Sequence, residues 1–299
     1  MKILNLRMHQ IRALKELKIE RGVLNTEGMM LVLKKRYAKT KDGGKMVFKY
    51  LDAQDDMKVM ARKMYTVNML NGSDNYNSIE ELIIPELAIS VDGNIAGFAM
   101  PLVEDHRNLG AILNDYDIPL EIKLPYLIQL GQIVDKVERV EDETFRLQFG
   151  DLNEFNFVID KDDKVHAVDL DSAYLGQDEP SNMAYYLLKN KYLNDFKEKY
   201  KSTNSGIIIP SDNTDLYCLN MIILNTLAKE DIFKQDIDTY NMYINHLNEV
   251  GVPMELIGAF MNIYMPVDNI NTTYALKKID PKIEKDIDFK VFKKEYNIK

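Results

Sequence analysis

The stretch FGDLNEFNFVIDKDDKVHAVDLDSAY, residues 149–174, carries most of the information about how this chain folds. The apolar run 157–159 and the mostly apolar run 165–170 flank a polar, charged segment at 161–164. Two short apolar runs separated by such a segment predict a β-hairpin. The turn would form at 161–164, and the ends of the hairpin would lie close together at its base.

Three polar residues stand at the base of this predicted hairpin. Asn156 is near the start of the first strand, and Asp169 is near the end of the second. Asp151 precedes Asn156 by five positions. The hairpin would therefore gather an acid, an amide and a second acid around one point. Such a point suits a divalent metal bound by oxygen atoms, with one carboxylate left to orient a hydroxyl group.

The spacing of Asp151, Asn156 and Asp169 resembles that of the protein kinase-like superfamily. The catalytic loop of that family reads H-[RG]-D-x-x-x-x-N, and a metal-binding Asp follows it in D-F-G or a variant. This chain has Phe149-Gly150 in place of His-Arg and Leu170-Asp171 in place of Phe-Gly. The segment 150–156 looks like the catalytic loop of RIO-type atypical kinases, and its Gly-Asp form is similar to that of aminoglycoside and choline phosphotransferases. The alternative is a solvated acidic hairpin in an unrelated domain.

The resemblance implies an α+β, two-lobed protein kinase-like fold. Residues 1–103 would form an N-lobe with a small antiparallel sheet and one helix, and residues 104–299 would form a larger helical C-lobe. ATP would bind as co-substrate with Mg²⁺ or Mn²⁺. Asp151 would accept or orient the proton of the acceptor hydroxyl group, whereas Asn156 and Asp169 would hold the metal. Asp171 would add a carboxylate near the metal and is a candidate further ligand.

Lys49 lies between apolar residues in the second of two predicted strands, 29–34 and 46–51. A buried ammonium group is costly unless it is paired. In the family, a strand lysine contacts the phosphates of ATP, so Lys49 is expected to do so here. The alternative is an edge lysine that faces water. The family pairs this lysine with a helix Glu, yet the predicted helix 53–70 contains none, which leaves Glu80 or Glu81 as candidates.

Two further parts of a nucleotide site follow from the resemblance. Gly22 and Gly28 occupy the place of the glycine-rich phosphate loop, although two turn glycines would look the same. Strands predicted at 82–91 and 95–103 are joined by a turn at 92–94. The end of the second strand would bind adenine through Pro101, Leu102 and Val103, with Met100 at the back of the pocket. Because Pro101 has no N–H group, Val103 would be the donor.

The second half of the chain is predicted to be mainly helical. Apolar residues at helical spacing indicate helices at 124–137 and 216–227, and further helices at 239–278. Asp215 would brace the catalytic loop or cap its helix, and Cys218 would be buried and inert. The tail from Asp280 is expected to be a solvated helix or a frayed end.

Composition excludes several classes of protein. The chain has 299 residues and a formal net charge of −9, which argues against nucleic acid or an anionic membrane as a partner. The single cysteine excludes an intrachain disulfide and a cysteine zinc cluster, and it fits a cytoplasmic location. The sequence contains no apolar stretch long enough to span a membrane.

The expected activity is transfer of phosphate from ATP to a hydroxyl acceptor, most readily as a protein serine/threonine kinase. The segment 172–214 is long enough to form a platform for a polypeptide. Gly150-Asp151 instead favours a small-molecule acceptor. A nucleotide-binding pseudokinase or scaffold is the third reading, since the helix glutamate and the full glycine motif are missing.

Overall fold

The protein is described by a computed structural model, which covers residues 1–17, 29–40, 43–51, 57–142, 144–176, 180, 186, 189, 208–211, 213–261 and 272–298. These residues form an α+β protein that divides into two compact units. The first unit contains Met1–Asn108, Val140–Phe149 and Phe155–Ser181, and the second contains the rest of the chain. The first crossing, after Asn108, lies close to the boundary that the sequence predicted after Val103. The chain returns to the first unit at Val140–Phe149 and again at Phe155–Ser181, where the hairpin at 157–167 pairs with a strand that ends at Asn108.

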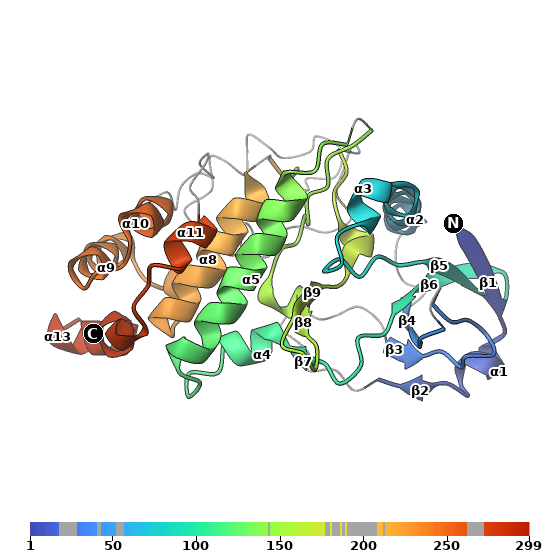
Figure 1. The fold of residues 1–299 in the computed structure, drawn as a ribbon, viewed down its shortest axis with the longest axis horizontal. Helices are drawn as coiled ribbons and strands as arrows, with labels where there is room; N and C mark the ends of the chain where they lie inside the picture. The colour runs from blue at the N-terminus through green and yellow to red at the C-terminus, as the bar shows by residue number, and fades with distance from the viewer. Residues whose placement is uncertain are drawn as a thin grey trace. The chain divides into compact units, whose positions relative to one another are not determined.

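The first unit is built on a six-stranded sheet (Figure 1). Its strands are β1 (Lys2–Leu6), β2 (Lys15–Glu16), β3 (Met29–Val32), β4 (Met46–Tyr50), β5 (Leu87–Val91) and β6 (Asn94–Pro101). Their order in the sheet is β1-β5-β6-β4-β3-β2, with β1 parallel to β5 and the other neighbours antiparallel. The expected strands at 29–34, 46–51 and 95–103 are thus present with slightly shorter bounds.

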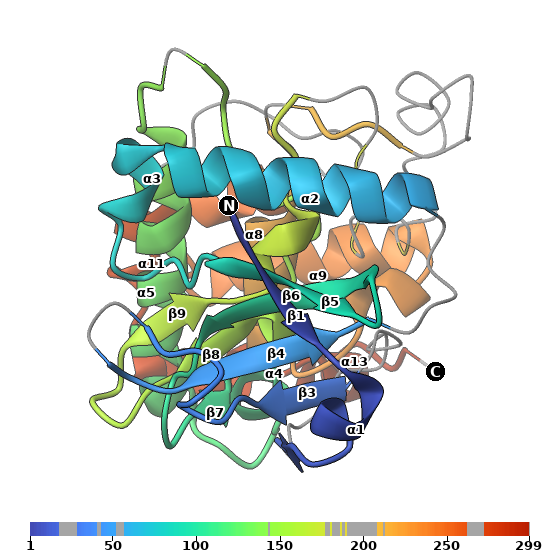
Figure 2. The same ribbon diagram turned by 90° about the vertical axis from the view of Figure 1, so that its right-hand side faces the viewer.

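The two faces of this sheet bury different side chains. Phe48 of β4 packs with Leu6 and Ile11 on the face next to helix α1 (Met8–Ile11). The other face packs Phe98 against Val67 of helix α2 (Met57–Gly72), which runs across the sheet in Figure 2. Successive strand residues point to opposite faces, so the residue after Phe48 points toward α2.

Some features of this unit differ from what the sequence predicted. β1 is a strand of its own, and the strand expected at 82–91 begins only at Leu87. Pro85 has no N–H group to give to a ladder, which explains why regular pairing starts after it. Leu82 forms an isolated bridge with Ala167 instead.

A short helix, α3 (Asp74–Asn77), follows α2 and is capped by Ser73.

The hairpin predicted at 157–170 forms a second, three-stranded sheet in the first unit. Its strands are β7 (Arg107–Asn108), β8 (Phe157–Ile159) and β9 (Val165–Ala167), in the order β7-β8-β9. A 3₁₀ turn, η1 (Glu154–Asn156), leads into β8, and another, η2 (Leu170–Ser172), follows β9. The Asn108 side chain donates to the carbonyl of Phe155 at 3.0 Å, which ties β7 to the start of the hairpin.

The second unit is helical. Its helices are α4 (Leu109–Leu113), α5 (Leu120–Glu138), α8 (Thr214–Ala228), α9 (Ile237–Glu249), α10 (Met254–Met261), α11 (Thr272–Leu276), α12 (Glu284–Ile287) and α13 (Phe289–Glu295), with 3₁₀ turns η3 (Ile232–Lys234) and η4 (Pro281–Ile283). α5 and α8 lie side by side, as Figure 1 shows. The described residues include no helix that is both long enough and apolar enough to cross a membrane.

The C-terminal tail differs from its expected form. Phe289 and Phe292 of α13 are fully buried, and both rings contact Tyr243 of α9. Tyr243 also donates through its hydroxyl group to the carbonyl of Ile287. The tail from Asp280 is therefore packed onto the helical unit rather than frayed, because its two aromatic residues recur at a spacing that puts them on one face of α13.

Candidate functional site

Lys49 lies in the middle of β4, on the face of the sheet that packs against α2. It pairs in register with Met30 of β3 and Phe98 of β6, so it is a central residue of the sheet and not an edge lysine. Only 6% of Lys49 is exposed. An ammonium group in this position requires negative partners, since a buried charge that lacks one is strongly destabilising.

Asp169 provides the first of these partners. It follows β9 and caps η2 from a left-handed backbone conformation, with φ 67° and ψ 27°. Few residues other than glycine adopt this conformation, although Asp and Asn do so more readily than most. Its carboxylate accepts a hydrogen bond from the Lys49 ammonium group, while a quarter of its side chain stays exposed. The strand lysine and the acid that follows the hairpin therefore lie side by side.

Asn156 lies at the same end of the hairpin as Asp169. The N–H group of Val168 donates to the Asn156 carbonyl at 2.9 Å, just beyond the last pair of the β8–β9 ladder. An amide and a carboxylate at this place are oxygen donors of the kind that Mg²⁺ uses together with phosphate oxygens. Within the described ranges, no group of three or more His, Cys, Asp and Glu side chains is arranged around a metal. A Mg²⁺ ion that is held by Asn156 and Asp169, with phosphate oxygens as its other ligands, would not need such a group.

Asp171 is held differently from Asp169. Its side chain is fully buried and accepts from Lys63 of α2 at 3.1 Å, and both of its oxygens lie 3.4 Å from the Lys49 nitrogen. Lys63 is also fully buried and donates to the Ser172 hydroxyl group at 3.1 Å. Thr66, one turn further along α2, donates to the carbonyl of Ala173 at 3.1 Å. We call Lys49, Lys63, Asp169 and Asp171 the buried charge cluster.

The two carboxyl groups of this cluster compete for the two ammonium groups. Burial raises the pKa of Asp169 to about 6; Lys49 opposes this rise, and the charge of Asp171 adds to it. Burial also works against ionisation of Asp171, but Lys49 and Lys63 outweigh it and hold the pKa of Asp171 well below its usual range. Asp171 is thus the firmly ionised member of the pair. Its oxygens face two lysines, which argues against the further metal-ligand role expected for it.

Asp171 and Lys63 also bear on how Lys49 is paired. The sequence offered Glu80 or Glu81 as the counter-ion, because helix α2 contains no glutamate. Asp169 and Asp171 supply carboxylates to Lys49 in the structure. Lys63 is a site residue that the sequence reading missed. Its spacing from Met60 and Val67, three and four positions away, puts it on the inward face of α2, and a lysine in an apolar stripe was the available signal.

Asp151 belongs to the second unit, as part of the loop 150–154. This loop has internal supports. Asn153 donates through its side chain to the carbonyl of Asp151 at 3.2 Å. Glu154 is buried and accepts from the Tyr186 hydroxyl group at 2.7 Å and from the Asn114 side chain at 2.9 Å. The backbone that presents Asp151 is therefore fixed by contacts on both sides of Asn153.

The start of helix α8 lies close to the same loop. Asp215 is buried in the first turn of α8, where Asn213 occupies the N-cap position. Cys218, one turn later, is fully buried. Burial raises the pKa of its thiol, and the charges of Asp215 and Asp151 raise it further. Both carboxylates therefore lie within electrostatic range of one thiol. This agrees with a supporting role for Asp215 near the loop, and it makes Cys218 unreactive.

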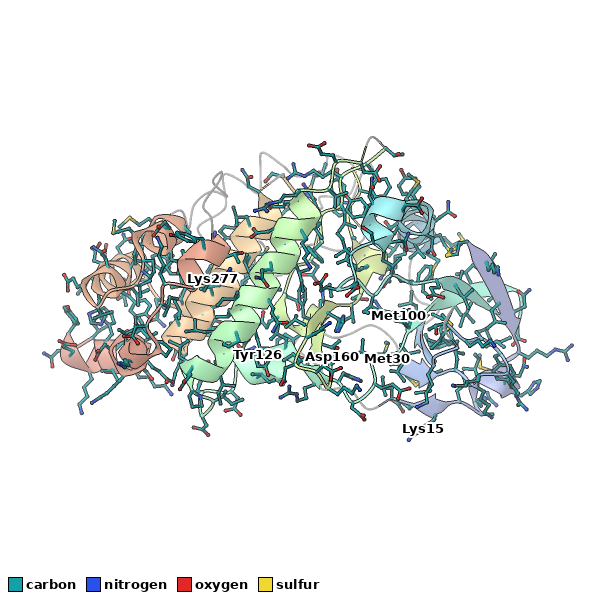
Figure 3. The ribbon with its side chains drawn as sticks, in the orientation of Figure 1. Lys15, Met30, Met100, Tyr126, Asp160 and Lys277 are labelled. Atoms are coloured by element: carbon teal, nitrogen blue, oxygen red, sulfur yellow. The ribbon has the colours of Figure 1, made fainter. Side chains whose placement is uncertain are left out.

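The segment expected to bind adenine follows β6. Met100 is buried and pairs in register with Val47, which shares the face of β4 that carries Lys49 (Figure 3 labels Met100 and Met30). The N–H group of Leu102 donates to the carbonyl of Lys45 at 3.0 Å. The carbonyl of Val103 contacts His106 Nδ1 at 2.9 Å, and its N–H group donates no hydrogen bond within the part of the chain that the structure describes.

Some predicted features fall outside the described residues. Gly22 and Gly28 of the expected phosphate loop are among them, as is most of the segment 172–214 that would form a platform for a polypeptide. These features stay predictions.

Comparison of the sequence with models of known protein families and with curated proteins finds no match.

Proposed function

We propose that this protein is an ATP- and Mg²⁺-dependent phosphotransferase with a two-lobed, protein kinase-like fold. The observation that carries the proposal is the pairing of Lys49, in the centre of the first unit's sheet, with Asp169 at the base of the β8–β9 hairpin. Asn156 stands at the same end of that hairpin. A lysine for phosphates and two oxygen donors for the metal therefore belong to one compact unit.

The apolar surface beside Lys49 supports a site for a nucleotide base. Val47 and Lys49 point to the same face of β4, and their register partners Met100 and Met30 lie on that face too. Ligand pockets are lined mainly by apolar groups, with a few polar groups that fix orientation. Within the described residues the N–H group of Val103 donates no hydrogen bond, which supports the expected role of this residue as a donor to the edge of adenine.

Each side chain then has a defined task in the proposed reaction. Lys49 neutralises and positions the phosphates, and Asn156 and Asp169 would hold Mg²⁺. The bound metal would neutralise the charge that develops on the phosphate oxygens. Asp151 accepts or orients the proton of the acceptor hydroxyl group. The bond between the γ-phosphorus and the oxygen that leaves with ADP breaks, and a bond from phosphorus to the acceptor oxygen forms. Positioning and charge neutralisation supply most of the acceleration.

The acceptor divides the proposal into two cases. A protein serine/threonine kinase is the first, and a small-molecule phosphotransferase is the second. The Gly150-Asp151 form favours the small molecule. Gly150 has φ 72°, a conformation that suits glycine, so the backbone just before Asp151 is not one that the usual arginine would adopt readily.

The proposal is tested by binding and transfer with purified protein. Saturating ATP, near one hundred times its Kd, is expected to add about 2.7 kcal/mol to the free energy of unfolding, and only when Mg²⁺ or Mn²⁺ is present. Incubation with γ-labelled ATP and cell extract, separated into proteins and small molecules, then identifies the acceptor fraction. Binding without transfer to either fraction would leave a nucleotide-binding pseudokinase. If no combination of a nucleotide and a metal shifts the melting curve, the phosphotransferase and the pseudokinase readings are both wrong.

A further inference from the structure

The buried charge cluster contains a lysine for which the proposed reaction has no use. Lys63 lies on α2, the helix from which the resemblance expects an acid to hold Lys49, and its charge has the opposite sign. It does not lie on the surface, since neither its side chain nor that of Asp171 is exposed. Burying this cation must serve a purpose that an apolar side chain at position 63 would not serve, because ion pairs replaced by apolar groups are often no less stable.

The geometry gives Lys63 a partner and, through that partner, a link to Lys49. Asp171 receives the Lys63 ammonium group at 3.1 Å, and it also lies 3.4 Å from the Lys49 nitrogen. The cluster holds two ammonium groups and two carboxylates, so its formal charge is balanced. If either Lys63 or Asp171 were neutral, the other charges would be unbalanced in a buried place.

Asp169 and Asp171 differ in whether they are available to a metal. Asp169 is partly exposed, whereas Asp171 is fully buried between the ammonium groups of Lys49 and Lys63. A metal bound to Asp169 would compete with Lys49 for this carboxylate. Asp171 is then the acid that remains beside Lys49, and Lys63 keeps it there.

We propose that Asp171 and Lys63 are positioning residues for Lys49, with Asp171 acting as its permanent counter-ion and Lys63 tying that counter-ion to helix α2. This inference rests on the proposed function. In this arrangement two side chains take the place of the helix glutamate. Lys63 of α2 supplies a cation, and Asp171 in the turn after β9 supplies the acid that pairs with Lys49. The contact from Thr66 to the Ala173 carbonyl holds the same turn to the same helix. Displacement of α2 would therefore move Asp171 and release Lys49.

The test is a double-mutant cycle on MgATP binding, with Lys49→Met, Lys63→Met and the double variant. Residues that act through one another give effects that do not add, whereas independent sites add within about twofold. Lys49→Met is expected to weaken MgATP binding by about tenfold, and Lys63→Met by about three- to tenfold. The double variant should bind within about twofold of Lys49→Met, because Lys63 has nothing left to position. Binding is measured well below each variant's melting temperature, with circular dichroism as the check on folding.

A matched control separates this role from a general effect on α2. Lys58 lies on the same helix and is exposed, so Lys58→Met should bind MgATP as the wild type does. If the effects of Lys49→Met and Lys63→Met multiply, Lys63 acts independently and the inference is wrong, while the proposed function stands. If the wild type does not bind MgATP at all, the proposed function itself fails. Should Lys63→Met not fold, Asp171→Asn replaces it in the same cycle, and additivity there overturns the inference equally.

Discussion

Lys63 of α2 and Asp171 of η2 form an ion pair at 3.1 Å, and neither side chain is exposed to solvent. The two residues are 108 positions apart in the chain. Their pairing fixes the position of the first unit's long helix relative to the turn that carries both acids of the buried charge cluster. Since Asp169 belongs to the same turn, the pair also determines where the proposed metal ligand lies.

The first prediction concerns the stability of this pair. Lys63→Met leaves the Asp171 carboxylate with one ammonium group fewer, and removal of one partner from a buried pair costs about 3–5 kcal/mol. Asp171→Asn should cost a similar amount, since it leaves Lys63 buried without its acid. The loss in the free energy of unfolding of the double variant should be smaller than the sum of the losses of the two single variants, by about 0.5–3 kcal/mol. Urea unfolding without nucleotide measures all three, with Lys58→Met expected within about 0.5 kcal/mol of the wild type. Strict additivity would show that the two side chains do not interact.

The second prediction concerns the division of roles between Asp151 and Asp169. Asp151→Asn keeps the size of the side chain but removes its basicity, so phosphoryl transfer should fall by about a hundredfold or more. MgATP binding should stay within about twofold of the wild type, because Asp151 contributes no phosphate or metal contact in the proposal. Asp169→Asn should weaken the Mg²⁺-dependent part of binding as well. Unchanged turnover in Asp151→Asn would exclude this residue as the group that accepts or orients the hydroxyl proton.

Local patterns in the sequence predicted much of this fold. The strand of Lys49, the hairpin after Asn156 and the apolar helices α5 and α8 were all identified, because each has a periodic apolar face and a recognisable turn or start. These features depend on residues close together in the chain. The α+β class follows from them directly.

The remaining features depend on contacts between distant parts of the chain. Lys63 resembles any helix lysine until Asp171 is placed beside it, and Asp171 resembles a second metal ligand until its two lysines are known. β1 is half exposed and pairs in parallel with β5, so its sequence carries no clear alternation. The tail looked solvated because Phe289 and Phe292 stand among many charges, and only Tyr243 shows where they pack.

The third prediction concerns Gly97, which supports the strand of Lys49 from β6. Gly97 has φ +142°, and a Cβ atom built on it would lie 1.9 Å from the carbonyl oxygen of Lys49. Gly97→Ala must therefore push β6 and β4 apart at this lysine. We expect a loss of about 2–4 kcal/mol in the free energy of unfolding, together with weaker MgATP binding. Gly72→Ala is the control, because nothing lies within 4 Å of its Cβ position at the end of α2. Equal stability of the two variants would contradict the close approach.

The fourth prediction concerns Lys123 of α5, which is 1% exposed and donates to the carbonyl of Leu113 at 2.9 Å. Burial lowers the pKa of Lys123 to about 8, and Lys229 lowers it further, although Asp115 and Glu284 oppose the shift. The ring of Tyr116 lies nearby, with its centroid 6.0 Å from the ammonium nitrogen. The folded protein therefore releases this proton at a lower pH than the unfolded chain does.

The sign of the effect on stability follows from proton binding. Between pH 8, where the folded protein loses this proton, and the ordinary lysine pKa of about 10.4, the unfolded chain binds more protons at this site. The contribution of Lys123 to stability therefore rises with pH across that window and is flat below it. Lys123→Met removes the contribution, so the stability difference between wild type and variant should shift in favour of the wild type from pH 7 to pH 10. Urea unfolding of wild type and Lys123→Met at several pH values measures this difference, and parallel curves for the two proteins would show that Lys123 keeps an ordinary pKa in the folded protein.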